Sequence, residues 1–202
     1  MLTIFSIAMS VALLLGVEKV RVNAQSSFAN TISGTDLIVG ARSGSIQLLL
    51  YSVFRIGDAT NNISFQSYQD IAQQKGVKWT IPISLGDSHR GFRVMGTSRD
   101  YFSVYQYGEQ RTLEFASGKQ FEGVFDAVIG SEVANVLNYA IGDQVIVSHG
   151  TGSASFTQHK DKPFVISGIL KHTGTPVDRT LHVSWAGIEA MHVNWQGAVK
   201  KR

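Results

Sequence analysis

The chain opens with a run of sixteen residues, from Leu2 to Val17, that carries no charge. As an α-helix at 1.5 Å per residue this run spans about 24 Å, against roughly 30 Å for the hydrocarbon core of a bilayer. Val20 and Val22, or residues upstream of Met1, can complete the span. Only 16% of the whole chain is charged, against roughly 25% in average soluble proteins. The sequence therefore predicts a membrane segment at the N-terminus.

A cleavable signal peptide is the first alternative for this run. Signal peptides have apolar stretches of this length, and Val22-Asn23-Ala24 can serve as the cleavage site. However, no Lys or Arg precedes the run, and Glu18, Lys19 and Arg21 stand where neutral residues are usual before a cut. The charges therefore favour a retained anchor.

A buried helix of a soluble protein is the second alternative. Such helices keep a polar stripe, whereas this run offers only Thr3, Ser6 and Ser10. The following segment, EKVRVNAQSSFANTIS, can continue the same helix until Gly34 ends it. We therefore expect a stalk that leaves the membrane.

The charge balance argues against a nucleic-acid partner. The formal net charge is +3, but Lys200, Lys201 and Arg202 supply three positive charges at the extreme C-terminus. No stripe of Lys and Arg able to follow a phosphate backbone lies between Glu18 and Val199. The chain has no cysteine, which excludes disulfides, thiolate metal sites and a catalytic thiol.

Short elements follow the stalk. Asp36 to Val39 is predicted as a strand, and the apolar run from Gly44 to Gly57 as a helix that either joins the core or faces a partner. A helix starting after an N-cap at Ser64 is expected to end at Gly76. Alternating residues at 77–83 and 92–96, with the turn-like GDSHRG at Gly86 to Gly91 between them, predict a hairpin with His89 and Arg90 at its tip.

The second half predicts a strand, helix, strand unit. It comprises a strand at 126–130, a helix from Ser131, and a strand at 144–149 after the turn at Gly142-Asp143. Residues 151–162 are polar, and 163–171 predict another strand. The fold class is α+β, with two lobes after the N-terminal helix and the second lobe at Val77 to Val147.

No motif points to catalysis, a cofactor or a metal. The glycine-rich loop Gly150 to Ser155 lacks a third glycine and a Walker lysine, and no nucleophile motif G-x-S-x-G occurs. Glu189 with His192 is a lone three-residue spacing. The histidines lack the i, i+4 pairing of a helical zinc site; they are His89, His149, His159, His172, His182 and His192. The acids are scattered, as shown by Asp58, Asp70, Asp100 and Asp126.

Two long stretches carry a family resemblance. FRVMGTSRDYFSVYQY, from Phe92, and LEFASGKQFEGVFDAVIGSEVANVLNYAIGDQVIV, from Leu113, are similar to the periplasmic core domain of MacB-type ABC transporter permeases, which include FtsX-like and LolC-like subunits. The matching pieces are Gly96 with Asp100-Tyr101-Phe102, Gly118 with Phe121, Ala127-Val128-Ile129-Gly130, and Gly142-Asp143.

A later stretch, from Pro163 to Val193, resembles the end of the same domain. Its most distinctive run is TGTPVDR, from Thr173 to Arg179. We expect a fixed turn there, in which Gly and Pro set the backbone and Asp178 or Arg179 braces a neighbouring strand.

The resemblance implies a domain order. Residues 1–17 are a transmembrane helix that is incomplete at its N-terminus, 18–35 a stalk, 36–193 the two-lobed extracytoplasmic MacB-like periplasmic core domain, and 194–202 a tail. Family members have three further membrane helices, so the chain is expected to be a fragment or a truncated reading frame.

The resemblance also implies a mechanical function at the cell inner membrane. The chain would be the permease subunit of an ABC transporter, working as a dimer with a second permease subunit and a separate cytoplasmic ATPase. The stalk would relay ATP-driven motion to a domain that engages a periplasmic partner or an exported substrate. The alternatives are an anchored or secreted binding domain without a transport role, and a periplasmic hydrolase whose dispersed site includes His149, His172 and Glu189.

Overall fold

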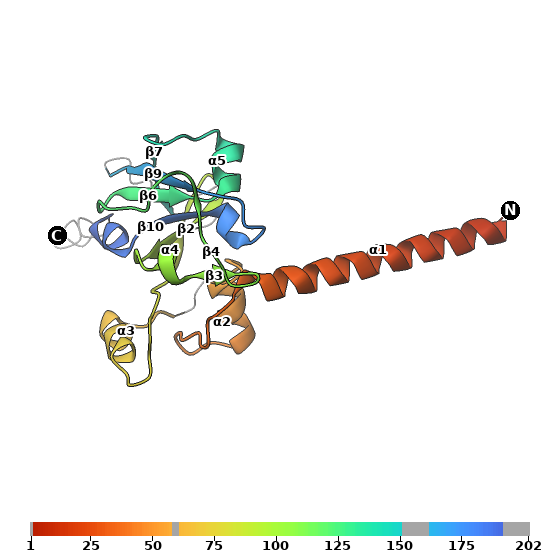
Figure 1. Cartoon of the computed structure of the whole chain (residues 1–202), viewed down its shortest axis with the longest axis horizontal. Helices are drawn as coiled ribbons and strands as arrows, with labels where there is room; N and C mark the ends of the chain where they lie inside the picture. Colours follow the sequence, from red (N-terminus) through yellow and green to blue (C-terminus); the bar gives the residue numbers. More distant parts are fainter. Residues whose placement is uncertain (1, 58–60, 151–161, 192–202) are drawn as a thin grey trace, which may run out of the picture.

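A long N-terminal helix and a mixed sheet domain make up the structure. It is a computed structural model that describes residues 2–57, 61–150 and 162–191. Helix α1 (Leu2–Thr31) is one continuous element that projects away from the rest of the chain (Figure 1). The predicted anchor and stalk are therefore a single rod, and Gly34 follows its end with a φ of 66°.

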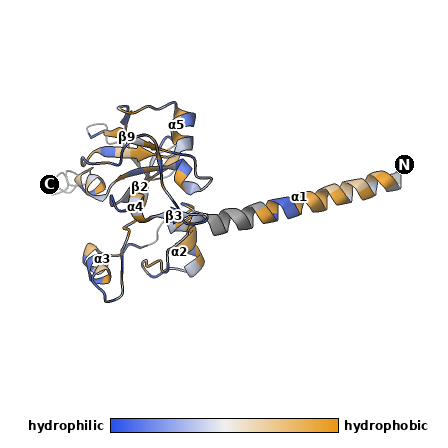
Figure 2. Ribbon diagram, viewed as in Figure 1, coloured by the Kyte–Doolittle hydropathy of each residue, from blue (hydrophilic) through white to orange (hydrophobic). Residues whose placement is uncertain are grey.

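Helix α1 is apolar toward its N-terminus, and its residues up to Val22 are exposed in the part of the chain that the structure describes. Figure 2 shows hydrophobic residues around this part of the helix rather than along one side. Ile4 is 70% exposed and Leu14 is 69% exposed. The stretch Thr3–Val22 is long and apolar enough to cross a membrane. A buried core helix of this chain is therefore excluded for the stretch.

The segment after α1 differs from the expectation at one point. Residues 36–39 form no strand, although they are extended. Helix α2 (Ser45–Ser52) occupies the apolar run as predicted but ends before Gly57. It packs only in part, because Val53 is 6% exposed whereas Ile46 is 72% exposed. The Tyr51 hydroxyl donates a hydrogen bond to the Leu85 carbonyl and ties α2 to the sheet.

Helix α3 (Phe65–Ala72) begins where the sequence predicts. The Ser64 side chain accepts a hydrogen bond from the Ser67 amide, which is the expected N-cap. The Phe65 ring lies 4.4 Å, centroid to centroid, from Trp185, which begins a helical stretch at 185–191. This contact links α3 to the end of the sheet domain.

The predicted hairpin exists, but its first strand lies later in the chain. Strands β1 (Ser84–His89) and β2 (Phe92–Thr97) pair antiparallel through Arg90 and Gly91, whose φ values are 46° and 86°. Both φ values are positive, as a two-residue type I′ turn requires. Residues 77–83 form no strand. Most of the expected loop GDSHRG is instead strand, because Asp87, Ser88 and His89 are buried.

Short elements connect the hairpin to the later strands. Helix α4 (Tyr101–Val104) is followed by the two-stranded pair β3 (Gln106–Tyr107) and β4 (Arg111–Thr112). Strands β5 (Phe115–Gly118) and β6 (Asp126–Ile129) come next, then helix α5 (Ser131–Leu137). The strand at 126–130 and the helix from Ser131 are therefore confirmed.

The predicted strand at 144–149 is split in two. Strand β7 (Gln144–Val145) pairs with β9 (Phe164–Leu170), whereas β8 (Ser148–His149) pairs with β1. The two short strands thus join distant parts of one sheet. A single strand there is wrong, because the pairing partners lie toward opposite edges of the sheet.

One sheet organises the domain. Its order is β5-β9-β6-β10-β2-β1-β8, where β10 (Thr180–Ser184) pairs parallel with β2 and antiparallel with β6. Strands after residue 147 therefore lie between strands of the predicted second lobe. The α+β class is confirmed, but the boundary Val77 to Val147 is wrong because β9 and β10 are inserted into the same sheet.

Side chains alternate across the sheet and form two cores. In β6, Ala127 and Ile129 face a core covered by α5, whereas Val128 faces an aromatic core covered by α4. The aromatic core contains the buried residues Leu85, Met95, Tyr101, Phe102, Tyr105, Tyr107, Leu113, Phe121, Val128, Leu170 and Val177. This aromatic core is the one that reaches the base of α1.

Candidate functional site

The candidate site is the joint where α1 meets the sheet domain. Thr31, the last residue of α1, is only 2% exposed. Its carbonyl accepts a hydrogen bond from the Tyr105 hydroxyl. Two residues on, the Ser33 amide donates to the Gln106 carbonyl at 3.0 Å and forms an isolated antiparallel bridge. The end of the rod is therefore latched to the segment that follows α4.

Gly34 turns the chain away from this latch. Its φ of 66° lies in the left-handed region, where a Cβ clashes with the backbone. A Cβ added there would also lie 2.7 Å from the side-chain oxygen of Gln106. Glycine is the residue that lets the chain leave the helix without displacing Gln106.

Packed aromatic rings connect the latch to the core of the sheet domain. The Tyr101 ring lies 4.9 Å from Tyr105 and 5.2 Å from His182 of β10, between ring centroids. The Phe102 ring lies 5.3 Å from Phe121. Contacts of this kind combine large buried area with a preferred geometry. A force on α1 would therefore reach β10 through packed rings.

A buried arginine lies under the joint. Arg55 follows α2, is 9% exposed and has a φ of 60°. Burial raises the pKa of Tyr105 to about 12, and the Arg55 charge opposes this rise. Burial lowers the pKa of His182 to about 3, with Arg55 as the next cause. Both groups are therefore neutral at pH 7 beside a positive charge.

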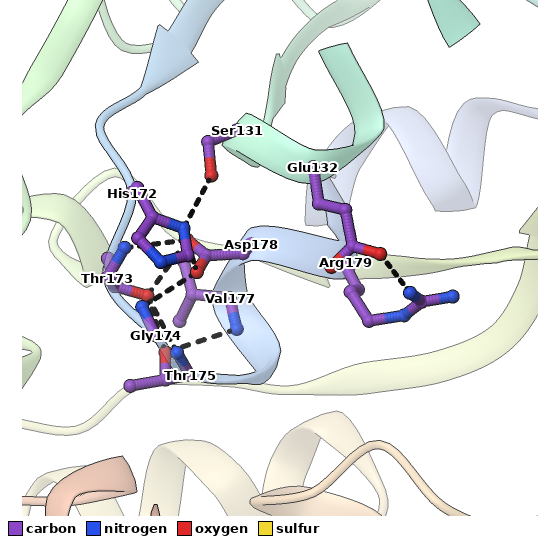
Figure 3. A network of polar contacts seen from close by, with 9 residues as sticks. All are labelled: Ser131, Glu132, His172, Thr173, Gly174, Thr175, Val177, Asp178 and Arg179. Carbon is purple, nitrogen blue, oxygen red and sulfur yellow. Dashed lines mark hydrogen bonds and ion pairs between the residues drawn. The ribbon is translucent and has the colours of Figure 1, made fainter. Parts of the chain in front are cut away.

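The turn from Thr173 to Arg179 borders the joint and is held by one carboxylate (Figure 3). Asp178 is 3% exposed and accepts from the Thr173 amide at 2.8 Å and the Gly174 amide at 2.7 Å. The Thr173 hydroxyl adds a third bond at 2.9 Å, and His172 Nδ1 lies 2.9 Å from the same carboxylate. The predicted fixed turn is present, and Asp178 holds the turn itself rather than a neighbouring strand.

The 3₁₀ helix η1 (Pro176–Arg179) completes this turn and contacts two elements. Arg179 pairs with Glu132 of α5, and its guanidinium lies 5.3 Å from the ring centroid of Phe92 in β2. A Cβ at Gly130 would lie 2.3 Å from the Val177 carbonyl oxygen. Gly130 therefore allows β6 and η1 to approach closely, which explains its place in the resembling piece Ala127 to Gly130.

An open groove of about 660 Å³ lies over the joint. Its wall combines the end of α1, the loop after α2, the start of β2 and the Thr173–Arg179 turn. The lining residues are Thr31, Phe54, Arg55, Ile56, Gly91, Phe92, Arg93, Glu132, His172, Gly174, Thr175, Pro176, Asp178, Arg179 and Thr180. The Thr173–Arg179 turn, which is the most distinctive run of the later resembling stretch, is thus adjacent to the latch.

The described histidines lie at separate places. His89 Nδ1 lies 2.7 Å from the Ile146 carbonyl, and His149 Nδ1 lies 2.9 Å from the Asp87 carboxylate. His172 belongs to the turn, and His182 lies in the aromatic core. Within residues 2–57, 61–150 and 162–191, no three metal-ligating side chains gather. His159, His192 and most of the loop at 150–155 lie outside these ranges.

The candidate acids have local roles where they are described. Asp70 accepts from the Gln66 side chain at 2.9 Å, and Asp126 accepts from the Glu122 and Gly123 amides at 3.0 and 2.7 Å. Asp100 stands at the N-cap of α4, and Asp58 lies outside the described residues. The Asp70 contact lies within α3 and the Asp126 contacts close a turn, so neither pairs two carboxylates for catalysis.

Sequence reasoning missed Arg55, Tyr105 and His182. Arg55 is the one charge inside the apolar run from Gly44 to Gly57, and a lone charge there is a signal of a buried or functional group. Tyr105 and His182 have no such signal. Only the fold places both of their rings against Tyr101.

The comparison with known families decides the identity. The model of the MacB-like periplasmic core domain matches residues 1–199. The chain belongs to this family. As a MacB-like domain it is a component of the ABC-transporter type, and its N-terminal helix is a candidate membrane span.

The solved structures that are similar to this MacB-like domain include one from an ABC-type transporter. It is the extracellular domain of the noncanonic ABC-type transporter YknZ from Gram-positive bacteria, with a TM-score of 0.42 and 14% identity. The match covers 66% of this chain and 67% of that chain. No curated protein matches the chain.

Proposed function

We propose that this MacB-like domain acts mechanically, as part of an ABC transporter permease subunit at the cell inner membrane. Residues 1–17 lie in the bilayer, and the rest of α1, from Glu18, is the stalk. A separate cytoplasmic ATPase drives relative motion of two permease subunits. The stalk passes this motion to the extracytoplasmic domain, which engages a partner or an exported substrate and catalyses no reaction.

One observation carries the proposal. Helix α1 runs without a break from the candidate span to Thr31, where the latch to Tyr105 and Gln106 begins. A continuous helix is stiff over this length, and the packed rings beneath the latch are a dense core. Displacement of the span therefore moves the sheet domain as a body. A binding module tethered only for localisation has no need of such a rigid connection.

Distance measurements between spin labels test the relay. The chain has no cysteine, so single cysteines can be placed without a background. Arg21→Cys labels the exposed stalk, and Asn135→Cys labels the exposed face of α5. The native complex with its ATPase, in nanodiscs, is measured with ADP and with a non-hydrolysable ATP analogue. The expected result is a constant stalk-to-domain distance within one subunit, with an ATP-dependent change between the domains of two subunits.

A flexible insertion provides the matched control. Gly-Gly-Ser inserted after Ile32 interrupts the latch without changing either labelled residue. We expect the stalk-to-domain distance to broaden and the ATP-dependent change between domains to be lost. A complex that shows no nucleotide-dependent change in the wild-type chain, or that contains no ATPase, would support the tethered binding domain instead.

A further inference from the structure

Arg55 carries a buried positive charge, and no residue in the described part of the chain forms an ion pair with it. Its side chain is 9% exposed, and its Nε and Nη1 atoms are buried without a hydrogen-bond partner among these residues. None of the ion pairs formed between described residues includes it. A buried charge is expected to be paired, because removing it from water costs several kcal/mol.

The groups around Arg55 cannot neutralise it. Tyr101, Tyr105 and His182 are the groups on which its charge acts, and all three are neutral at pH 7 because burial disfavours their charged forms. His182 Nε2 is itself buried without a partner among the described residues. The centre of the joint is therefore polar, positive and incompletely satisfied.

The acids of the neighbouring groove are already engaged. Glu132 pairs with Arg179, and Asp178 accepts the bonds of its own turn. Three arginines line the groove beside these two acids. The carboxylates of Glu132 and Asp178 repel a doubly charged phosphate more strongly than a singly charged ligand. The planar guanidinium also matches a carboxylate in shape.

We propose that the groove over the joint binds a carboxylate, which pairs with Arg55. The carboxylate belongs either to an acidic side chain of a protein that docks on the domain or to a small free organic acid. Its binding links the end of α1, the loop after α2 and the Thr173–Arg179 turn, since all three line the same groove. An occupied groove therefore stiffens the joint between stalk and sheet.

Thermal melting of the full chain in detergent micelles tests this proposal. The probes are sodium acetate at constant ionic strength, the peptide acetyl-Gly-Glu-Gly-amide, and its uncharged match acetyl-Gly-Gln-Gly-amide. We expect acetate and the Glu peptide to raise the wild-type Tm saturably, by about 3 to 6 °C at ten times the apparent Kd. A larger effect of the Glu peptide indicates a docked side chain, and an equal effect indicates a small acid. No effect of either probe overturns the proposal.

Variants assign the effect to Arg55. Arg55→Met removes an unpaired buried charge and keeps a long apolar chain, so its Tm without a probe is expected to equal or exceed that of the wild type. The same variant should not respond to acetate, whereas the exposed control Arg42→Met should respond as the wild type does. A response that Arg55→Met retains would overturn the proposal. If Arg55→Met does not fold, the Nε–H signal of Arg55 in the ¹⁵N-arginine-labelled wild type must shift on adding acetate.

Asp58 supplies the remaining check, because it lies three residues after Arg55 and outside the described residues. If no acidic group of the chain itself pairs with Arg55, the substitution Asp58→Asn leaves both the Tm and the acetate response unchanged. A loss of stability in Asp58→Asn that Arg55→Met cancels would show an internal ion pair and would overturn the proposal.

Discussion

At the scale of single residues, a few buried polar groups shape the joint that holds α1. The Tyr105 hydroxyl donates a hydrogen bond to the last carbonyl of α1, where the helix itself supplies no backbone donor. Arg55 and His182 are buried nearby, at 9% and 0% exposure. At this scale the joint depends on polar atoms placed among aromatic rings.

Tyr105→Phe removes the hydroxyl and leaves the ring in place. We expect the free energy of unfolding to fall by about 1 kcal/mol, because the Thr31 carbonyl loses a partner in a buried place. Urea denaturation of the detergent-solubilised chain measures the change. Tyr107→Phe is the matched control, since Tyr107 is as buried and its hydroxyl makes no hydrogen bond recorded among the described residues. Equal losses in the two variants would contradict a specific role for Tyr105.

His182 makes the domain sensitive to acid. The unfolded chain binds this proton near pH 6.5, whereas burial and Arg55 hold the folded pKa at about 3. Because the folded pKa is lowered, the stability is complete above pH 6.5 and is lost progressively as the pH falls toward 3. Burial lowers the pKa of His89 in the same direction.

The pH dependence of urea unfolding between pH 7.5 and 4 checks this prediction. His182→Gln is expected to flatten it by about one proton taken up on unfolding. A wild-type profile that does not change below pH 6.5 would rule out a buried neutral His182.

At the scale of elements, the turns on either side of the sheet domain set the direction of the chain. Gly34 redirects the backbone after α1, Gly91 closes the β1–β2 hairpin, and Asp178 closes the turn before β10. Each turn uses either a positive φ or a buried carboxylate. Strand pairing alone does not provide this geometry.

Gly34→Ala tests the first of these turns. We expect a loss of about 1 to 2 kcal/mol, because alanine at a φ of 66° is strained and its Cβ approaches Gln106. Gly86→Ala is the control, since its φ is not positive and a Cβ there meets nothing within 4 Å. Circular dichroism melts of both variants compare the two positions. If the two melts shift equally, the latch does not depend on the turn at Gly34.

At the scale of the whole molecule, an exposed apolar rod is joined to a well-packed sheet domain. Such a rod is unstable in water, because the side chains of Thr3–Val22 find no cover among the residues that the structure describes. The fold of the sheet domain, by contrast, closes around its own two cores. The apolar part of α1 is therefore suited to a lipid bilayer, and the sheet domain is suited to water.

Deletion of Leu2 to Val17 tests whether this helix holds the chain in the membrane. We expect the intact chain to stay with membranes after alkaline carbonate extraction and the shortened chain to be released with its sheet domain folded. N-terminal sequencing of the intact chain is the control, because a mature protein that starts at Gln25 indicates a signal peptide. Intact, uncleaved chain in the aqueous fraction would contradict membrane anchoring.

Local patterns were sufficient for several elements. Charge-free residues at 2–17 predict the first part of α1, Ser64 predicts the start of α3, and the strand patterns at 126–130 and 163–171 predict β6 and β9. In each case neighbouring residues in the sequence carry the information, through a continuous apolar run, an N-cap or strand periodicity. The family resemblance also follows from such local pieces.

Other features depend on partners far along the chain. Residues 36–39 and 77–83 have strand-like composition but find no neighbouring strand, whereas GDSHRG becomes strand because β2 and β8 pair with it. The insertion of β9 and β10 between earlier strands likewise has no local signal.

The sequence by itself determined an apolar N-terminal helix, an α+β domain, a turn at Thr173 to Arg179 and the family. Only the tertiary structure decided the strand order, the latch at Thr31 and the burial of Arg55 beside Tyr105 and His182. The reason is physical: helix periodicity and capping act between residues a few positions apart, whereas a hydrogen bond from Tyr105 to Thr31 spans 74 positions. Contacts of that kind exist only after the chain has folded.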